Sequence, residues 1–163
     1  MRDYDAPSVL DVGGGSGRVG EFLLEAGASR YVDVDISEPM LNLARTRLAR
    51  FGDKVELVIG DFVTASLEGP FDIAVAVGYF DYIEDAAAHL TRIGELTSGS
   101  LVASFPRWTW TKGPIRKLRY EVINDCPIFD YTAAGLRSLL NGAGFTKLDI
   151  RHGKSGFLVR ADK

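Results

Sequence analysis

Cysteine is scarce and long hydrophobic segments are missing in this 163-residue sequence, and these absences exclude several classes of protein. The single cysteine, Cys126, cannot form a disulfide within the chain, which agrees with a reducing compartment. No apolar run approaches the roughly 20 residues that span a bilayer, and no apolar segment near the N-terminus resembles a secretory signal. We therefore expect a cytoplasmic protein that does not associate with membranes.

Excess charge of one sign is also missing. Lys and Arg number 19 and Asp and Glu 22, so a formal net charge of −3 provides no field that would attract nucleic acid. Cys126 has no second candidate ligand near it, and we expect it to pack rather than to bind a metal. The sequence therefore predicts neither a nucleic-acid partner nor a metal site, and its length suits one domain.

Glycine is what the sequence has in excess, with five of its 18 glycines between Gly13 and Gly20. A short apolar run over residues 9–12 precedes them, and apolar residues recur at helical spacing over residues 19–26. This order predicts a strand, a glycine turn and a helix, whose positive end lets backbone amides approach a ligand. Residues 15–20 also fit the G-x-G-x-x-G dinucleotide pattern, with Asp35 placed to accept from ribose hydroxyls.

The rest of the chain alternates strands with helices. Apolar patterns predict further strands over residues 31–36, 55–59, 71–77 and 100–105, and helices after Ser37, over residues 85–96 and over residues 132–141. This alternation is typical of a parallel sheet with helices on both faces. The last two strands, residues 145–151 and 157–159, are separated by too few residues for a parallel crossover, so one of them must run antiparallel.

Asp11 narrows the choice of ligand. It ends the first strand, two residues before Gly13, where a carboxylate would repel a dinucleotide pyrophosphate and would suit a ligand with ammonium or sulfonium charge. Its alternative role is to accept hydrogen bonds from amides of the glycine loop, and both roles can hold together.

Four segments, residues 9–17, 34–41, 60–62 and 71–80, resemble in order the motifs of the class I S-adenosylmethionine-dependent methyltransferases. The resemblance implies one Rossmann-like domain over residues 1–163, three layers thick, with a seven-stranded sheet that is mostly parallel. It also implies S-adenosylmethionine as the cofactor, S-adenosylhomocysteine as the product, and in-line methyl transfer to an O, N or C nucleophile of a small molecule. The acceptor itself is not indicated.

The resemblance implies roles for individual residues. Asp11 and the loop glycines would hold the methionine end, Asp35 would accept from both ribose hydroxyls, and Asp61 would accept from the adenine amine. The simpler interpretations are that Asp35 caps the next helix and that Asp61 is a turn residue. The implied cofactor-binding residues are Asp11, Gly13, Gly15, Gly17, Asp35, Ile36, Met40, Asp61, Phe62 and Gly78.

Methyl transfer depends on alignment and water exclusion, and a general base is needed only where the nucleophile must lose a proton. The catalytic residue is therefore left open, with candidates Tyr79, Asp81 and Tyr82 at the ligand-binding rim. Many relatives have a histidine at the position of Tyr82, so a histidine base there is excluded, and we expect Tyr82 to be a wall of the pocket. The candidate substrate-binding residues are Tyr79, Phe80, Tyr82, Phe105, Trp108 and Arg116.

Residues 107–130 form an irregular insertion rich in aromatic and basic residues. We expect either a lid that selects a flat or anionic small molecule or a solvated helix on the edge of the sheet. His89 falls off the apolar stripe formed by the later residues of its helix and is expected on the surface. His152 is expected roughly 15 Å from the fourth strand, too far for direct catalysis.

Two alternatives to a small-molecule methyltransferase remain open. The first is an NAD-binding oxidoreductase, which Asp11 and the antiparallel end of the sheet disfavour. The second is a truncated or degenerate cofactor-binding subunit, because only eight residues precede the first strand whereas relatives usually carry N-terminal cap helices. The expected absence of these helices would leave the pocket more open and makes a homodimer a reasonable expectation.

Overall fold

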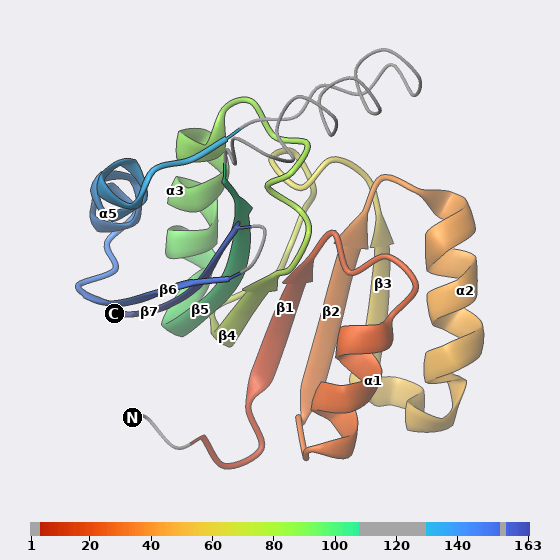
Figure 1. Ribbon diagram of the computed structural model, residues 1–163. Coiled ribbons are helices and arrows are strands. Elements are labelled where there is room, and N and C mark those ends of the chain that lie inside the picture. Colours follow the sequence, from red (N-terminus) through yellow and green to blue (C-terminus); the bar gives the residue numbers. More distant parts are fainter. Residues whose placement is uncertain (1–3, 108–129, 154–155) are drawn as a thin grey trace.

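A computed structural model describes residues 4–107, 130–153 and 156–163 of the chain. In these residues seven strands form one sheet that is covered by helices on both faces (Figure 1). The strands are β1 Ser8–Val12, β2 Arg30–Asp35, β3 Val55–Ile59, β4 Phe71–Ala76, β5 Thr97–Pro106, β6 Lys147–His152 and β7 Gly156–Asp162. The helices are α1 Arg18–Glu25, α2 Glu38–Leu48, the 3-10 helix η1 Ala49–Lys54, α3 Ala86–Leu96 and α5 Ala133–Gly142.

The strand order β3-β2-β1-β4-β5-β7-β6 confirms the predicted fold class. Strands β1 to β5 pair in parallel, whereas β7 runs antiparallel to both of its neighbours. The chain leaves β1 toward β3 and then returns to the other side of β1 to form β4. Ligands of open α/β sheets bind at such a switch point, outside the carboxyl ends of the strands.

The two faces of the sheet bury separate apolar clusters. On one face, α1 and α2 cover the side chains of Val9, Tyr31 and Val75 with Leu24, Ala44 and Leu48 among their contacts. On the other face, α3 and α5 pack over a larger cluster that includes Leu10, Val12 and Phe105. Alternate residues of β1 thus enter opposite clusters, as expected for a strand buried on both faces.

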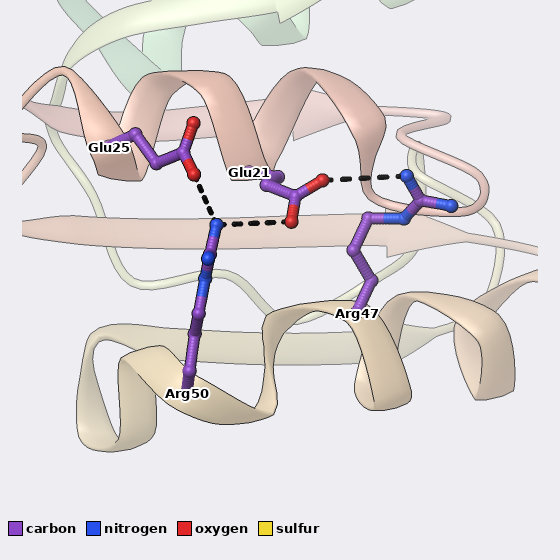
Figure 2. Close-up of polar contacts among 4 residues, drawn as sticks. All are labelled: Glu21, Glu25, Arg47 and Arg50. Carbon is purple, nitrogen blue, oxygen red and sulfur yellow. Dashed lines mark hydrogen bonds and ion pairs between the residues drawn. The ribbon is translucent and has the colours of Figure 1, made fainter.

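Ion pairs connect the helices of the first face. Arg47 of α2 lies 3.5 Å from a carboxylate oxygen of Glu21 on α1, and Arg50 of η1 contacts both Glu21 and Glu25 (Figure 2). These side chains are half-buried or exposed, so each pair contributes at most about 1 kcal/mol. These carboxylate and guanidinium groups therefore pair with one another where the helices meet.

The observed strand ends differ from the predicted ones at the C-terminal hairpin. Strand β7 extends to Asp162 because it pairs with β5 from Ser100 to Pro106. Strand β6 begins at Lys147 rather than at Phe145, whose amide donates to the carbonyl of Leu140 and thereby closes α5. Pairing partners and a helix end, which the local pattern does not show, account for these shifts.

Residues 108–129 lie outside the described part of the chain, so the lid prediction for residues 107–130, including Trp108 and Arg116, stays a prediction, as does the packing of Cys126. In the described residues, no helix has both the length and the apolar character needed to cross a membrane.

Candidate functional site

The glycine loop between β1 and α1 has the backbone conformation that only glycine adopts readily. Gly13, Gly15 and Gly17 have φ values of 70°, 61° and 73°, all in the left-handed region. The loop is held from below by β2, because the amide of Gly13 donates to the carbonyl of Val34 at 2.8 Å. The cluster of glycines in the sequence is therefore a requirement of this turn.

Two carboxylates of β2 accept hydrogen bonds from further amides of the glycine loop. The amide of Gly14 donates to Oδ1 of Asp33 at 3.0 Å, and that of Gly15 donates to Oδ2 of Asp35 at 3.0 Å. Oδ1 of Asp35 also accepts from the amide of Ser37 at 2.8 Å. Ser37 makes no capping hydrogen bond with its own side chain, so the carboxylate of Asp35 joins the loop to the start of α2.

A cavity of about 340 Å³ opens beside this loop at the carboxyl ends of the strands. Most of the residues that it brings together are far apart in the sequence and were predicted to share one site, whereas Val34, Gly60, Ile83 and His89 were not. Its lining consists of Gly13, Val34, Asp35, Ile36, Gly60, Asp61, Phe62, Gly78, Tyr79, Tyr82, Ile83 and His89. Ile36 is 77% exposed and offers an apolar surface to a flat ring, while Asp35 and Asp61 supply acceptors.

Four of the expected cofactor residues lie elsewhere. Asp11 is 2% exposed and accepts a hydrogen bond from the hydroxyl of Tyr31 at 2.7 Å, beneath the loop. Gly15 and Gly17 shape the turn from outside the cavity lining, and Met40 stands exposed on α2. The contacts of Asp11 therefore show neither of the two roles considered for it, and its action on a cofactor stays a prediction.

Phe80 and Phe105, expected to contact substrate, belong to the core. They are 0% and 1% exposed and stack with ring centroids 4.4 Å apart. Asp81 and Phe105 border a separate hollow of about 240 Å³. His152 lies within hydrogen-bond distance of Arg107 and is also outside the 340 Å³ cavity. Of the catalytic candidates, Tyr79 and Tyr82 line that cavity.

His89 was expected on the surface, and that prediction is wrong. Its Nδ1 lies 2.7 Å from the hydroxyl oxygen of Tyr79, and both side chains line the cavity. The sequence held a signal for this, because His89 follows the buried Ala86 by three residues and precedes the buried Ile93 by four. The apolar stripe was defined from Leu90 onward, so it left out the first turn of α3.

The surroundings of Tyr79 and His89 determine the protonation state of each side chain. Burial raises the pKa of Tyr79, and the nearby charges of Asp61 and Asp35 add to the rise. Burial lowers the pKa of His89, although Asp61 and Asp85 act in the opposite direction. At neutral pH the phenol therefore keeps its proton and the imidazole is neutral, which makes Tyr79 unsuited to act as a general base.

Asp33 is a second residue that sequence reasoning missed. It is 0% exposed, and its Oδ2 has no hydrogen-bond partner among the described residues. Burial, followed by the charges of Asp11 and Asp35, raises the pKa of Asp33 to about 8, although the Gly14 amide opposes this. Burial also raises the pKa of Asp11 to about 6. Asp33 escaped notice because residues 31–36 were interpreted as an apolar strand.

A more open hollow of about 440 Å³ lies across β5, β7 and β6 and is lined by Val102, Asp149, Arg151, Leu158, Val159, Arg160 and Asp162. None of the predicted site residues that the structure describes borders it. In the described part of the chain, no group of three His, Cys, Asp or Glu residues is arranged to hold a metal ion.

Comparison with known proteins decides the family. Residues 9–98, more than half of the chain, match a family model described as a methyltransferase domain. The chain belongs to this methyltransferase family. This assignment favours the methyltransferase hypothesis over the nicotinamide-dependent alternative, and it covers the glycine loop, β2, β4 and α3.

Two curated relatives match part of the methyltransferase chain. A probable fatty acid methyltransferase of Pseudomonas putida is 32% identical over 99 residues, which are 58% of this chain and 25% of the relative. A ubiquinone biosynthesis O-methyltransferase of Aromatoleum aromaticum is 31% identical over 90 residues, or 54% of this chain and 38% of the relative. The matched segments thus cover well under half the length of these relatives.

Solved structures of methyltransferases share the fold. A structure of an S-adenosylmethionine-dependent methyltransferase from Mesorhizobium loti superposes with a TM-score of 0.81 at 18% identity, covering 100% of this chain and 94% of the other. Magnesium protoporphyrin IX methyltransferase from Synechocystis with bound S-adenosylhomocysteine gives a TM-score of 0.77 at 21% identity, covering 97% and 74%.

Proposed function

We propose that this methyltransferase-family chain binds S-adenosylmethionine in the 340 Å³ cavity and methylates a small molecule at oxygen, nitrogen or carbon. The observation that carries the proposal is the meeting of Asp35, Asp61 and Ile36 in one cavity beside the glycine loop. A carboxylate has about four acceptor sites, so Asp35 can accept ribose hydroxyls while it still holds the amides of Gly15 and Ser37.

The adenine end fits the opposite wall. Asp61 uses Oδ1 to accept from the amide of Val63 at 2.7 Å, which leaves Oδ2 to accept from an exocyclic amine. Ile36 and the aromatic side chains of Phe62 and Tyr79 provide apolar surface for a flat base. Gly78, whose amide donates to the hydroxyl of Ser104 at 2.8 Å, would direct its carbonyl toward the amino group of the cofactor.

The bound cofactor supplies a methyl group already activated by its sulfonium charge. The protein's own residues then need to align the acceptor with that group and to exclude water. Tyr82, which is 52% exposed at the cavity, is positioned to contact an acceptor. Because Tyr79 holds its proton, we assign no base to the acceptor, which suits a nucleophile that needs no deprotonation by the protein.

The names of the curated relatives and of the Synechocystis structure, which refer to a fatty acid, to ubiquinone biosynthesis and to a porphyrin, support a small-molecule acceptor. A cytoplasmic location is proposed from the single cysteine, which suits a reducing compartment. A homodimer remains part of the proposal, to be tested by the mass of the protein in solution.

Calorimetry with S-adenosylmethionine, S-adenosylhomocysteine and NAD tests the proposed function. We expect both methionine-derived ligands to bind and NAD to give no heat, and a metabolite screen with a labelled methyl donor should then reveal the acceptor. Binding of NAD alone would contradict the proposal. Binding of the donor with no transfer to any acceptor would instead support a degenerate cofactor-binding subunit.

A further inference from the structure

Beneath the glycine loop lie three carboxyl groups, Asp11, Asp33 and Asp35, which we call the carboxyl cluster. We propose that Asp33 is a positioning residue of the cofactor site, and that binding of the cationic cofactor releases a proton from its carboxyl group. This inference rests on the proposed function, because it needs S-adenosylmethionine to bind above the loop.

Strand pairing places the carboxyl cluster on one face of the sheet. Asp11 of β1 and Asp33 of β2 are register partners, so their backbones lie about 4.8 Å apart on adjacent strands. Asp33 and Asp35 are two residues apart on β2 and therefore share a face. Asp33 and Asp35 accept the amides of Gly14 and Gly15, so both are joined directly to the loop.

The hydrogen bonds of Asp33 are incomplete in the unliganded protein. Its side chain is fully buried, Oδ1 accepts a hydrogen bond from one amide, and Oδ2 has no partner in the described part of the chain. Burial of an ionised carboxylate costs free energy when one of its oxygens accepts no hydrogen bond, so the neutral, protonated form is favoured. The pKa of Asp33, raised to about 8 by burial and then by its acidic neighbours, agrees with a carboxyl group that holds a proton at neutral pH.

The charges around Asp33 provide no compensating cation. On its own sheet it faces Asp11, Asp35 and the phenol of Tyr31. Charged side chains of the neighbouring elements are Arg18, Glu21 and Glu25 of α1, Glu38, Arg45 and Arg47 of α2, and Glu56 of β3. Glu21 and Glu25 pair with Arg47 and Arg50 (Figure 2), Glu56 pairs with Arg30, and no ion pair among the described residues reaches the carboxyl cluster.

The cofactor can supply the missing positive charge. S-adenosylmethionine carries a sulfonium and an ammonium against one carboxylate, whereas S-adenosylhomocysteine has no sulfonium and is neutral overall. A cation above the loop lowers the free energy of the ionised form of Asp33, and the carboxyl proton passes to solvent. The Gly14 amide then donates to a charged acceptor, which strengthens its hydrogen bond and holds the loop more firmly.

Steric contact makes this coupling direct. A Cβ atom built on Gly14 would lie 2.6 Å from Oδ1 of Asp33 and 2.7 Å from its Oδ2, so the loop backbone rests on this carboxyl group. A change in the ionisation of Asp33 is therefore felt at the loop without an intervening side chain.

Calorimetry of the whole chain in two buffers of different ionisation enthalpy measures the protons released on binding. At pH 7 we expect close to one proton per S-adenosylmethionine bound, and affinity that rises nearly tenfold per pH unit between pH 6 and pH 7. S-adenosylhomocysteine should release far less. Asp33→Asn, which keeps an acceptor for Gly14, should bind the cofactor with most of this pH slope lost. Asp72→Asn, at the other end of the sheet, should keep the wild-type slope.

The other outcomes distinguish failure of the proton coupling from failure of the proposed function. Binding of S-adenosylmethionine without proton release, equal release with S-adenosylhomocysteine, or an unchanged slope in Asp33→Asn would overturn the coupling and leave the proposed function intact. Failure of the wild type to bind either ligand would overturn the proposed function itself. If Asp33→Asn does not fold, carbon-13 NMR of the wild-type aspartate carboxyl groups gives the answer. The Asp33 signal should titrate near pH 8 without ligand and be ionised in the complex, and a signal that ignores the ligand contradicts the coupling.

Discussion

The two ends of the same sheet hold buried or half-buried carboxyl groups in opposite conditions. At the amino end, Asp72 accepts from the amide and the hydroxyl of Ser8 at 2.9 and 2.7 Å. Asp162, also at that end, accepts from Ser100 and Arg160. At the carboxyl end, Asp33 has a buried oxygen that accepts no hydrogen bond from the described residues, and Asp11 accepts one from the phenol of Tyr31. One end is satisfied within the described residues, and the other is not.

The pKa directions follow the same division. Burial alone would raise the pKa of Asp162, but hydrogen bonds from Ser100 and Arg160 and the charge of Arg160 hold it below its usual value. At the carboxyl end, burial and neighbouring acids raise the pKa values of Asp11 and Asp33. Satisfied carboxylates stabilise a fold, whereas the unsatisfied ones belong to the carboxyl cluster that we propose to be coupled to cofactor binding.

Replacement of Asp35 should give the largest effect on the carboxyl end. Asp35→Ala removes the acceptor proposed for both ribose hydroxyls, and we expect cofactor binding to weaken by about 1.5–3 kcal/mol, since hydrogen bonds to charged groups contribute this much. Stability should also fall by about 1–2 kcal/mol, because the amides of Gly15 and Ser37 lose their acceptor. Calorimetry with S-adenosylhomocysteine measures the effect, and unchanged affinity would separate Asp35 from the site.

The unliganded protein should lose stability as the pH rises from 6 to 8. The pKa of Asp33 is raised in the folded state to about 8, so the folded protein holds a proton that the unfolded chain has lost. The resulting slope is about 1.4 kcal/mol per pH unit for one proton, with stability highest at the acidic side. Urea unfolding at several pH values tests this, and loss of most of the slope in Asp33→Asn identifies the group. Stability that rises over this range would contradict the assignment.

A change at the amino end of the sheet should lower stability and leave cofactor affinity nearly unchanged. Ser8→Ala removes the hydroxyl that donates to Asp72 and accepts from its amide at 3.0 Å. We expect a loss of about 1–2 kcal/mol in the free energy of unfolding, because two partly buried hydrogen bonds disappear. Cofactor affinity should stay within about twofold of the wild type, since a change of 0.4 kcal/mol or less is expected so far from the cavity. Weaker cofactor binding would show that the two ends are not independent.

The smallest effect is expected at the Tyr79–His89 hydrogen bond. Tyr79→Phe removes the hydroxyl partner of a half-buried imidazole and should cost about 0.5–1.5 kcal/mol of stability. The chain has two histidines, so proton NMR can follow the titration of His89 with His152 as an internal reference. We expect the pKa of His89 to lie below its ordinary value in the wild type and to move on substitution. An identical titration in both proteins would show that the hydrogen bond does not form in solution.

Local patterns sufficed for most of the fold and part of the site. Strand β3 was predicted with its observed ends, because four of its five residues are apolar, Glu56 alone interrupts them, and Lys54 and Gly60 border the segment. The glycine loop, Asp35 and Asp61 could be placed at one edge because the carboxyl ends of parallel strands meet there. The resemblance to methyltransferases then identified which residues of that edge belong together.

What failed depended on neighbours that lie far away in the sequence. Phe80 follows β4 at the rim, yet it turns inward because Phe105 of β5 offers a stacking partner. The hydrogen bond between His89 and Tyr79 forms only because α3 packs beside the loop after β4. The condition of Asp33 depends on Asp11 of the neighbouring strand and on the backbone of Gly14. Such relations require strand register and helix packing, which spacing alone does not determine.

A crystal structure with S-adenosylhomocysteine tests the central claim most directly, namely that the cavity beside the glycine loop is the cofactor site. We predict the ribose hydroxyls within about 3 Å of the Asp35 carboxylate, at hydrogen-bond distance, with adenine between Ile36 and the wall formed by Asp61 and Phe62. A ligand bound instead in the open hollow over β5, β7 and β6, or a ribose that makes no contact with Asp35, would contradict the account.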